Sequence, residues 1–220
     1  MEENKKKELI IPLKAVFFDF DGVILDSVNV KTEAFAKMFR SYGSEVEQKV
    51  VDYHLAHCGI SRFNKFRYYY EKLLNKSINE EEIANLGDKF SQLVLQGVLE
   101  APFIEGALES LQLLHKQNIP AFVVSGTPEE ELKFIIKRRN IEVWFKEVHG
   151  SPRLKHEIIQ DIQKRYNIES SKSLFVGDAM TDYNAAKATG TRFFGIVSKN
   201  TSSPFPQDTQ ISSTVCFLSE

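Results

Sequence analysis

Two aspartates separated by one residue follow an apolar run near the start of this chain. The run Val16-Phe17-Phe18 suits a central strand, because both faces of a parallel sheet are buried. Asp19 and Asp21 do not suit such burial, since a buried carboxylate is costly unless it is paired or binds a metal. Ligands of open α/β sheets collect at the carboxyl ends of the strands. We therefore expect this strand to deliver both aspartates to a site, with a simple turn at Asp21-Gly22 as the alternative.

Two further strand-like runs, residues 121–124 and 173–176, also end in polar residues. The polar residues that follow these runs, or that begin the helix between them, are Ser125, Gly126, Lys155, Asp178 and Asp182. If the strands are parallel, their carboxyl ends meet at one edge of the sheet. The sequence therefore predicts that these groups converge with the first aspartate pair.

Carboxylates crowded at one edge would raise one another's pKa values, and a hard divalent cation would relieve that repulsion. Oxygen ligands with retained waters suit Mg²⁺. A metal beside a hydroxyl, backbone N–H groups and a lysine suits a phosphoryl group. In that chemistry Asp19 can attack phosphorus and form an aspartyl-phosphate. Asp21 can protonate the leaving oxygen and then deprotonate the attacking water.

Four segments in this order resemble the motifs of the haloacid dehalogenase superfamily: DFDGV at 19–23, SGT at 125–127, Lys155, and GDAMTD at 177–182. The resemblance covers essentially the whole chain. It implies that Asp19 is the nucleophile and Asp21 the acid/base. It also implies that Asp19, Asp178 and the main-chain carbonyl of Asp21 hold Mg²⁺. Ser125 and Gly126 would bind the phosphate, and Lys155 would balance its charge. Asp182 would support the metal-bound waters or orient Lys155.

The resemblance also separates activities. Members that dehalogenate lack the second aspartate, so the presence of Asp21 favours phosphate hydrolysis or phosphotransfer. We expect a Mg²⁺-dependent phosphatase acting on a small phosphorylated metabolite, either a sugar phosphate or a phosphoglycolate-like compound. Phosphonate-cleaving members use a cap lysine, for which Lys31 and Lys37 are the candidates in the first cap helix, although both suit a solvated surface.

A phosphomutase of the β-phosphoglucomutase type is the main alternative. Gly59 with Ser61-Arg62 resembles the cap loop of such members, in which an arginine meets a second phosphate. The competing interpretation of Arg62 is an exposed residue on a serine-capped helix. A catalytically idle binding module is a third possibility.

The pattern of elements predicts an α/β fold with a Rossmann-like parallel sheet and helices on both faces. Further strands are expected at 192–197 and 214–218, and a loop at 198–213. Core helices are expected at 106–116, 129–138, 155–166 and 182–189, the second capped by Thr127. Residues 28–97 show only helical periodicity, in segments 31–42, 45–57, 61–74 and 79–95. This predicts a helical cap domain (28–97) inserted into a catalytic core (1–27 and 98–220).

Composition narrows the class of protein. The 220 residues carry a net charge of −2 and are 42% hydrophobic, which fits a globular protein and gives no electrostatic footprint for nucleic acid or an anionic membrane. No stretch suits a signal peptide or a membrane span. Cys58 and Cys216 are expected to be reduced thiols, and His54 and His57 structural. We expect a cytoplasmic monomer or homodimer.

Overall fold

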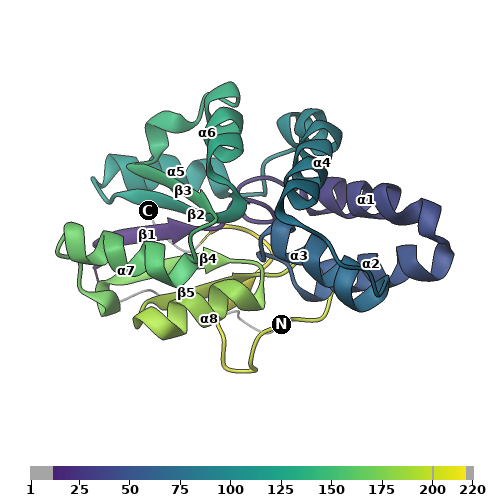
Figure 1. Ribbon diagram of the computed structural model, residues 1–220. Coiled ribbons are helices and arrows are strands. Elements are labelled where there is room, and N and C mark those ends of the chain that lie inside the picture. Colours follow the sequence, from purple (N-terminus) through teal and green to yellow (C-terminus); the bar gives the residue numbers. More distant parts are fainter. Residues whose placement is uncertain (1–11, 200, 217–220) are drawn as a thin grey trace.

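The computed structural model describes residues 12–199 and 201–216. Its core is a sheet in which each strand pairs with its neighbours in parallel, in the order β3-β2-β1-β4-β5-β6 (Figure 1). The strands are β1 (Ala15–Phe18), β2 (Ala121–Pro128), β3 (Glu147–Ser151), β4 (Ser173–Gly177), β5 (Arg192–Ile196) and β6 (Ile211–Ser212). The central strand β1 lies between β2 and β4, so both of its neighbours are strands that also end in polar motif residues.

Alternation along β1 explains why helices cover both faces of the sheet. Val16 and Phe18 belong to one apolar cluster, which includes residues of α5 (Ala107–Lys116) and α6 (Glu129–Arg138). Phe17 belongs to the other cluster, packed against α7 (Lys155–Arg165) and α8 (Met180–Thr189). Successive side chains of a strand point to opposite faces, so a continuous apolar run requires cover on each side. This confirms the predicted α/β fold.

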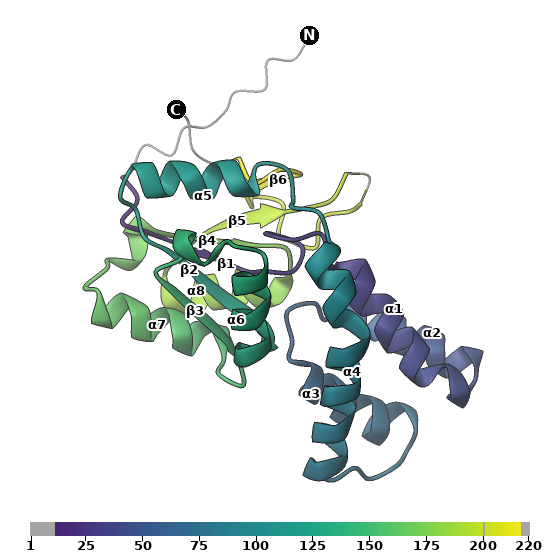
Figure 2. The same cartoon turned by 90° about the horizontal axis from the view of Figure 1, so that it is seen from above.

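Four helices form the cap, which lies beyond the carboxyl ends of the strands (Figure 2). They are α1 (Val28–Phe39), α2 (Ser44–Ala56), α3 (Arg62–Tyr68) and α4 (Glu80–Glu100), and we call them the cap helices. Their interior is aromatic: the Phe35 ring lies 4.3 Å from that of Phe90 and 5.7 Å from those of Phe66 and Tyr69, measured between centroids. This aromatic interior is continuous with the apolar cluster that covers one face of the sheet. The division of the chain at residues 28 and 97 stays a prediction.

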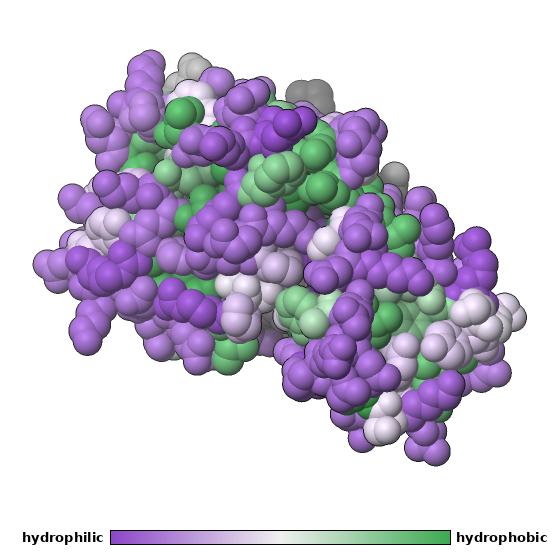
Figure 3. Space-filling view, turned by 45° about the horizontal axis from the view of Figure 1, so that its top comes forward, coloured by the Kyte–Doolittle hydropathy of each residue, from purple (hydrophilic) through white to green (hydrophobic). Residues whose placement is uncertain are grey.

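Short turns complete the described elements: η1 (Arg40–Tyr42), η2 (Tyr69–Leu73), η3 (Glu142–Trp144) and η4 (Ser170–Lys172). The face in Figure 3 is mostly hydrophilic, with scattered apolar patches. Among the exposed large apolar side chains is Phe134 of α6, at 46% exposure. No helix of the described segments is both long and apolar enough to cross a membrane.

Two strands differ from the sequence prediction. β3 was not predicted at all, because its sequence EVHGS has no apolar run and, as an edge strand, it pairs only with β2. β6 lies at 211–212, inside the predicted loop 198–213, and the predicted strand at 214–218 is wrong for residues 214–216. Residues 217 and 218 lie outside the described part of the chain. Edge strands need less apolar sequence than central ones, which is why both errors fall at the edges of the sheet.

Candidate active site

The carboxyl end of β1 delivers Asp19 to the edge of the sheet. The Asp19 backbone N–H donates to the carbonyl of Val176 on β4 at 2.9 Å, which continues the parallel ladder into the site. Its side-chain Oδ1 accepts a hydrogen bond from the N–H of Phe20 at 2.7 Å. Asp19 is buried, and one of its oxygens lies within 4.8 Å of oxygens from Asp178 and Asp182. The sheet thus brings Asp19, which follows β1, together with Asp178 and Asp182, which both follow β4.

Lys155, at the start of α7, neutralises part of this acidic group. Its Nζ lies 2.8 Å from Asp19 Oδ2 and 2.6 Å from Asp182 Oδ1. Burial opposes the charge on Lys155, but the carboxylates of Asp182 and Asp19 prevail and raise its pKa above the ordinary value. Asp182 also accepts a hydrogen bond from the backbone of Ala179 at 3.1 Å, at the start of α8. Asp182 thus contacts Lys155 directly, and its two predicted roles, supporting the metal waters or orienting Lys155, stay predictions.

Asp21 lies in a different electrostatic setting from Asp19. It accepts hydrogen bonds from Ser27 Oγ at 2.6 Å and Thr127 Oγ1 at 3.0 Å, and it pairs with Lys31 Nζ. Burial would raise the pKa of Asp21, but the Lys31 charge and these hydrogen bonds hold it below the usual range. The backbone turns sharply at Gly22, where φ is +79° and a Cβ would lie 2.3 Å from Asp178 Oδ2. Only glycine fits here, so the turn at residue 22 leaves the space that the Asp178 carboxylate occupies.

The end of β2 supplies Ser125, Gly126 and Thr127. Ser125 is buried, and its Oγ accepts a hydrogen bond from the Thr127 N–H at 3.1 Å. A Cβ at Gly126 would lie 2.5 Å from the carbonyl oxygen of Gly59, so the cap loop approaches this segment closely. The predicted capping role of Thr127 is wrong, because β2 continues to Pro128 and α6 begins at Glu129. The Thr127 hydroxyl instead lies between Asp21 and Lys31. It accepts a hydrogen bond from Lys31 Nζ at 2.8 Å and donates one to Asp21.

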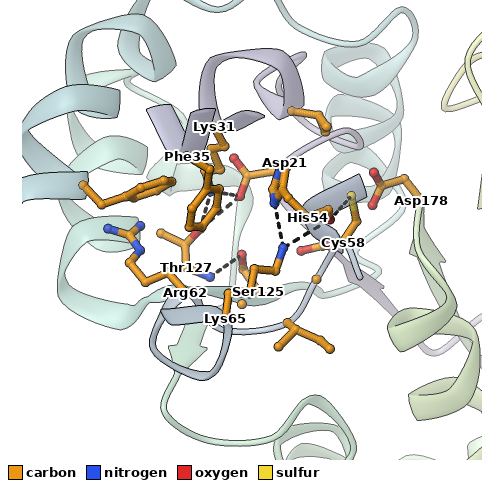
Figure 4. Close-up of a pocket in the computed structure, with 16 residues that line it drawn as sticks. Asp21, Lys31, Phe35, His54, Cys58, Arg62, Lys65, Ser125, Thr127 and Asp178 are labelled. Carbon is orange, nitrogen blue, oxygen red and sulfur yellow. Dashed lines mark hydrogen bonds and ion pairs between the residues drawn. The ribbon is translucent and has the colours of Figure 1, made fainter. Parts of the chain in front are cut away.

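Core and cap together enclose one cavity over this edge of the sheet (Figure 4). Its volume is about 50 Å³, and a larger cavity of about 510 Å³ adjoins it at Gly59, Ile60, Ser125 and Gly126. The core contributes the polar residues Asp19, Asp21, Ser125, Gly126, Thr127 and Asp178. The cap contributes Val28, Lys31, Phe35, His54, Cys58, Gly59, Ile60, Arg62, Lys65 and Phe90. The cap helices therefore supply cations and apolar walls above the acidic floor.

Arg62 lines this cavity but already has partners. Its guanidinium donates to both carboxylate oxygens of Glu131 on α6, at 2.9 and 2.6 Å, and to Ser91 Oγ of α4 at 2.7 Å. Its side chain is only 4% exposed, which is incompatible with the interpretation of an exposed surface arginine. This bidentate pair ties α3 of the cap to α6 of the core.

The sequence did not single out three of the polar groups at the cavity, Lys31, His54 and Lys65, for the site as found. Thr127 was expected at the strand end with Ser125 and Gly126. Lys31 was considered only for phosphonate chemistry, and His54 only as a structural histidine. One signal could have found Lys65: it lies three residues after Arg62, and residues with that spacing share a helix face. Cys58, a free thiol, also lines the cavity, whereas Cys216 is free and exposed.

The donor set fits a hard divalent cation. Burial, followed by the charges of Asp19 and Asp182, raises the pKa of Asp178 well above its ordinary value, so a positive charge is needed beside it. Asp19 and Asp178 offer carboxylate oxygens within 4.8 Å of each other, and all of these donors are oxygens, as Mg²⁺ prefers.

Comparisons with known proteins agree with this geometry. A family model described as haloacid dehalogenase-like hydrolase matches residues 16–196. The phosphorylated carbohydrates phosphatase of Thermotoga maritima is 24% identical over 191 residues, covering 84% of this chain and 86% of that protein. A phosphoglycolate phosphatase of Pseudomonas fluorescens is 24% identical over 198 residues, covering 83% of this chain and 69% of that protein.

Solved structures share the fold. β-Phosphoglucomutase from Clostridium difficile matches with a TM-score of 0.71 at 20% identity, covering 84% of this chain and 85% of that one. The family match spans the first aspartate pair, the Ser125 segment, Lys155 and the two later aspartates. The chain therefore belongs to the haloacid dehalogenase-like hydrolases, which confirms the family and the enzyme class predicted from its four motifs.

Proposed function

We propose that this enzyme is a Mg²⁺-dependent phosphatase that hydrolyses a small phosphorylated metabolite through an aspartyl-phosphate on Asp19. The observation that carries the proposal is the shared cavity, which Asp19, Asp21 and Ser125 all line, with Lys155 bound to Asp19. A nucleophile, an acid/base, a hydroxyl donor and a fixed cation are the groups that phosphoryl transfer needs.

The residues divide the chemistry between them. Asp19 attacks phosphorus while Phe20 N–H and Lys155 hold its carboxylate in place. The bond between phosphorus and the ester oxygen breaks, and Asp21 gives a proton to the departing alcohol. Water then attacks phosphorus, returns a proton to Asp21 and releases phosphate and Asp19. Lys31 favours the charged form of Asp21, so Asp21 must take up a proton before it can act as the acid in the first step.

Mg²⁺ would be held by Asp19, Asp178 and the main-chain carbonyl of Asp21. When bound, it supplies positive charge that balances the phosphoryl oxygens. Ser125, with the backbone at Gly126, would bind those oxygens from the side of β2.

Relatives support two substrate types, since their names refer to phosphorylated carbohydrates and to phosphoglycolate. A phosphomutase is the second candidate, because a β-phosphoglucomutase shares the fold. Arg62, the cap arginine expected to meet a second phosphate in a mutase, is already bound to Glu131. This pairing favours the hydrolase.

The test is release of inorganic phosphate from a panel of sugar phosphates, phosphoglycolate and nucleotides, with Mg²⁺ or EDTA. We expect release from the wild type that requires the metal and that Asp19→Asn abolishes. Turnover only in the presence of a bisphosphate primer, with little free phosphate, would instead identify a mutase.

A further inference from the structure

Lys65 is a buried cation without a negatively charged partner. It lies on α3, is 2% exposed and lines the cavity (Figure 4). The other two cations in the lining are neutralised: Lys31 by Asp21, and Arg62 by Glu131. Within residues 12–199 and 201–216, no carboxylate lies within ion-pair distance of Lys65.

The partner that Lys65 does have is neutral. Its Nζ lies 2.7 Å from His54 Nδ1 and 3.4 Å from the His54 carbonyl oxygen. A lysine ammonium can only donate, so His54 Nδ1 accepts and the imidazole carries no charge. Burial, followed by the charge of Lys65, lowers the pKa of His54 to about 3, which keeps the ring neutral. The histidine therefore positions the ammonium without cancelling its charge.

An ammonium buried in this way is unfavourable until an anion reaches it. Burial lowers the pKa of Lys65 to about 8, the direction expected of a charge taken out of water without a counter-ion. His54 accepts two of the three protons on Nζ, so a proton remains for a ligand in the cavity. The other polar residues of the cavity are carboxylates of the core, the residues at the end of β2, and cations that already have partners. Lys65 is therefore the place where a second anionic group of the substrate would be stabilised.

We propose that Lys65 is a specificity-determining residue that binds a substrate carboxylate, so that the enzyme selects small phosphate esters of hydroxy acids. This inference rests on the proposed phosphatase function. A carboxylate matches the single charge of one amine, whereas a second phosphoryl group carries between one and two charges.

The test compares two esters that differ only in this group, 2-phosphoglycolate and 2-hydroxyethyl phosphate. Wild type should prefer the acid in kcat/KM by about 10- to 100-fold, the range expected for one hydrogen bond to a charged group. Lys65→Met should remove that preference, mainly by raising KM for the acid, and should change kcat/KM for the neutral ester by less than about threefold. Lys72→Met, which removes an exposed lysine of the same cap, should leave both unchanged.

Binding gives a second readout that does not require turnover. Calorimetry on Asp19→Asn should show tighter binding of the acid than of the neutral ester, and Lys65→Met in that background should abolish the difference. Equal loss for both esters in Lys65→Met, or equal binding of the two by Asp19→Asn, would overturn the role of Lys65. A wild type that releases phosphate from no compound would contradict the proposed function, while the calorimetric comparison would still decide the role of Lys65.

Discussion

Two lysines of the cap line the same cavity and have opposite electrostatic roles. Lys31 pairs with Asp21 and holds the pKa of that carboxyl below its usual range. Lys65 donates to neutral His54, its ammonium lies 5.6 Å from the centroid of the Phe35 ring, and burial lowers its own pKa to about 8. The partner of each lysine therefore decides whether its charge serves the acid/base or is left for the substrate.

At the residue scale we predict that discrimination in favour of a carboxylate substrate falls as the pH rises through about 8. Lys65 is charged below its lowered pKa and neutral above it, so the cation that binds the carboxylate is lost on the alkaline side. Lys65→Arg should retain discrimination at alkaline pH, because arginine stays charged. The measurement is kcat/KM for 2-phosphoglycolate and for 2-hydroxyethyl phosphate, as a function of pH.

The other titratable groups around Lys65 do not account for a loss of discrimination near pH 8. Burial raises the pKa of Cys58 to about 11, so the thiol stays protonated through this range. His54 stays neutral. The remaining charged groups that act on Lys65 are Lys31, Asp21 and Asp178. These groups act on both esters alike. If kcat/KM falls at alkaline pH equally for the acid and for the neutral ester, the pH effect does not come from Lys65.

Residues of the core site were predictable because each follows a recognisable strand. Asp19, Asp178 and Ser125 stand directly after apolar runs, so their meeting at one edge follows from a parallel sheet. Lys65 was not predictable in the same way, because it reaches the cavity from α3 of the cap. Thr127 was expected at the correct strand end, but it lies within β2 rather than at a helix cap.

At the scale of the element, the aromatic interior of the cap helices should dominate their stability. Phe35 is 2% exposed, and its ring lies within 5.7 Å of three other rings that form this interior. Phe35→Ala should lower the free energy of unfolding by about 3–5 kcal/mol, since it leaves a cavity among large rings. Urea unfolding followed by circular dichroism measures this.

A matched control is Phe134→Ala, which removes the same side chain from an exposed site on α6. It should change the free energy of unfolding by no more than about 0.5 kcal/mol. Similar losses in the two variants would show that the cap interior is not packed as described.

The pair of Arg62 and Glu131 should hold α3 against α6. Its side chains are 4% and 11% exposed, so Glu131→Gln leaves a buried arginine without a counter-charge. Breaking such a pair costs about 3 kcal/mol, so amide hydrogen exchange in α3 should become roughly 100-fold faster, provided that α3 opens locally. Glu130→Gln, at a neighbouring position whose side chain is 90% exposed, should not change the exchange. Unchanged exchange in Glu131→Gln would show that the pair does not restrain the cap.

Helices and strands were predictable where they present a continuous apolar face to the core. Helix α6 has the bounds predicted for it, Glu129–Arg138, because its apolar residues recur with helical spacing. The edge strands β3 and β6 escaped prediction, since pairing on one side makes little demand on sequence. The helix predicted to run to residue 95 continues as α4 to Glu100, where the chain returns to the core.

At the scale of the whole molecule, the carboxylates and the cations that line the cavity come from different layers. The sheet edge supplies the carboxylates, and the cap helices supply Lys31, Arg62 and Lys65. The two layers also touch beside the cavity, where Thr181 Oγ1 of α8 donates to the Cys58 carbonyl at 3.0 Å. The pair of Lys31 with Asp21 and the pair of Arg62 with Glu131 join the same two layers.

The most direct test of the account is to trap the covalent intermediate. Wild type is mixed with its best substrate, labelled with ³²P in the phosphoryl group, and the reaction is quenched with acid before one turnover is complete. We predict label on the protein, mapped by digestion to the peptide that contains Asp19, and none in Asp19→Asn. Rapid release of labelled phosphate with no labelled protein at any time, or undiminished release by Asp19→Asn, would contradict the account.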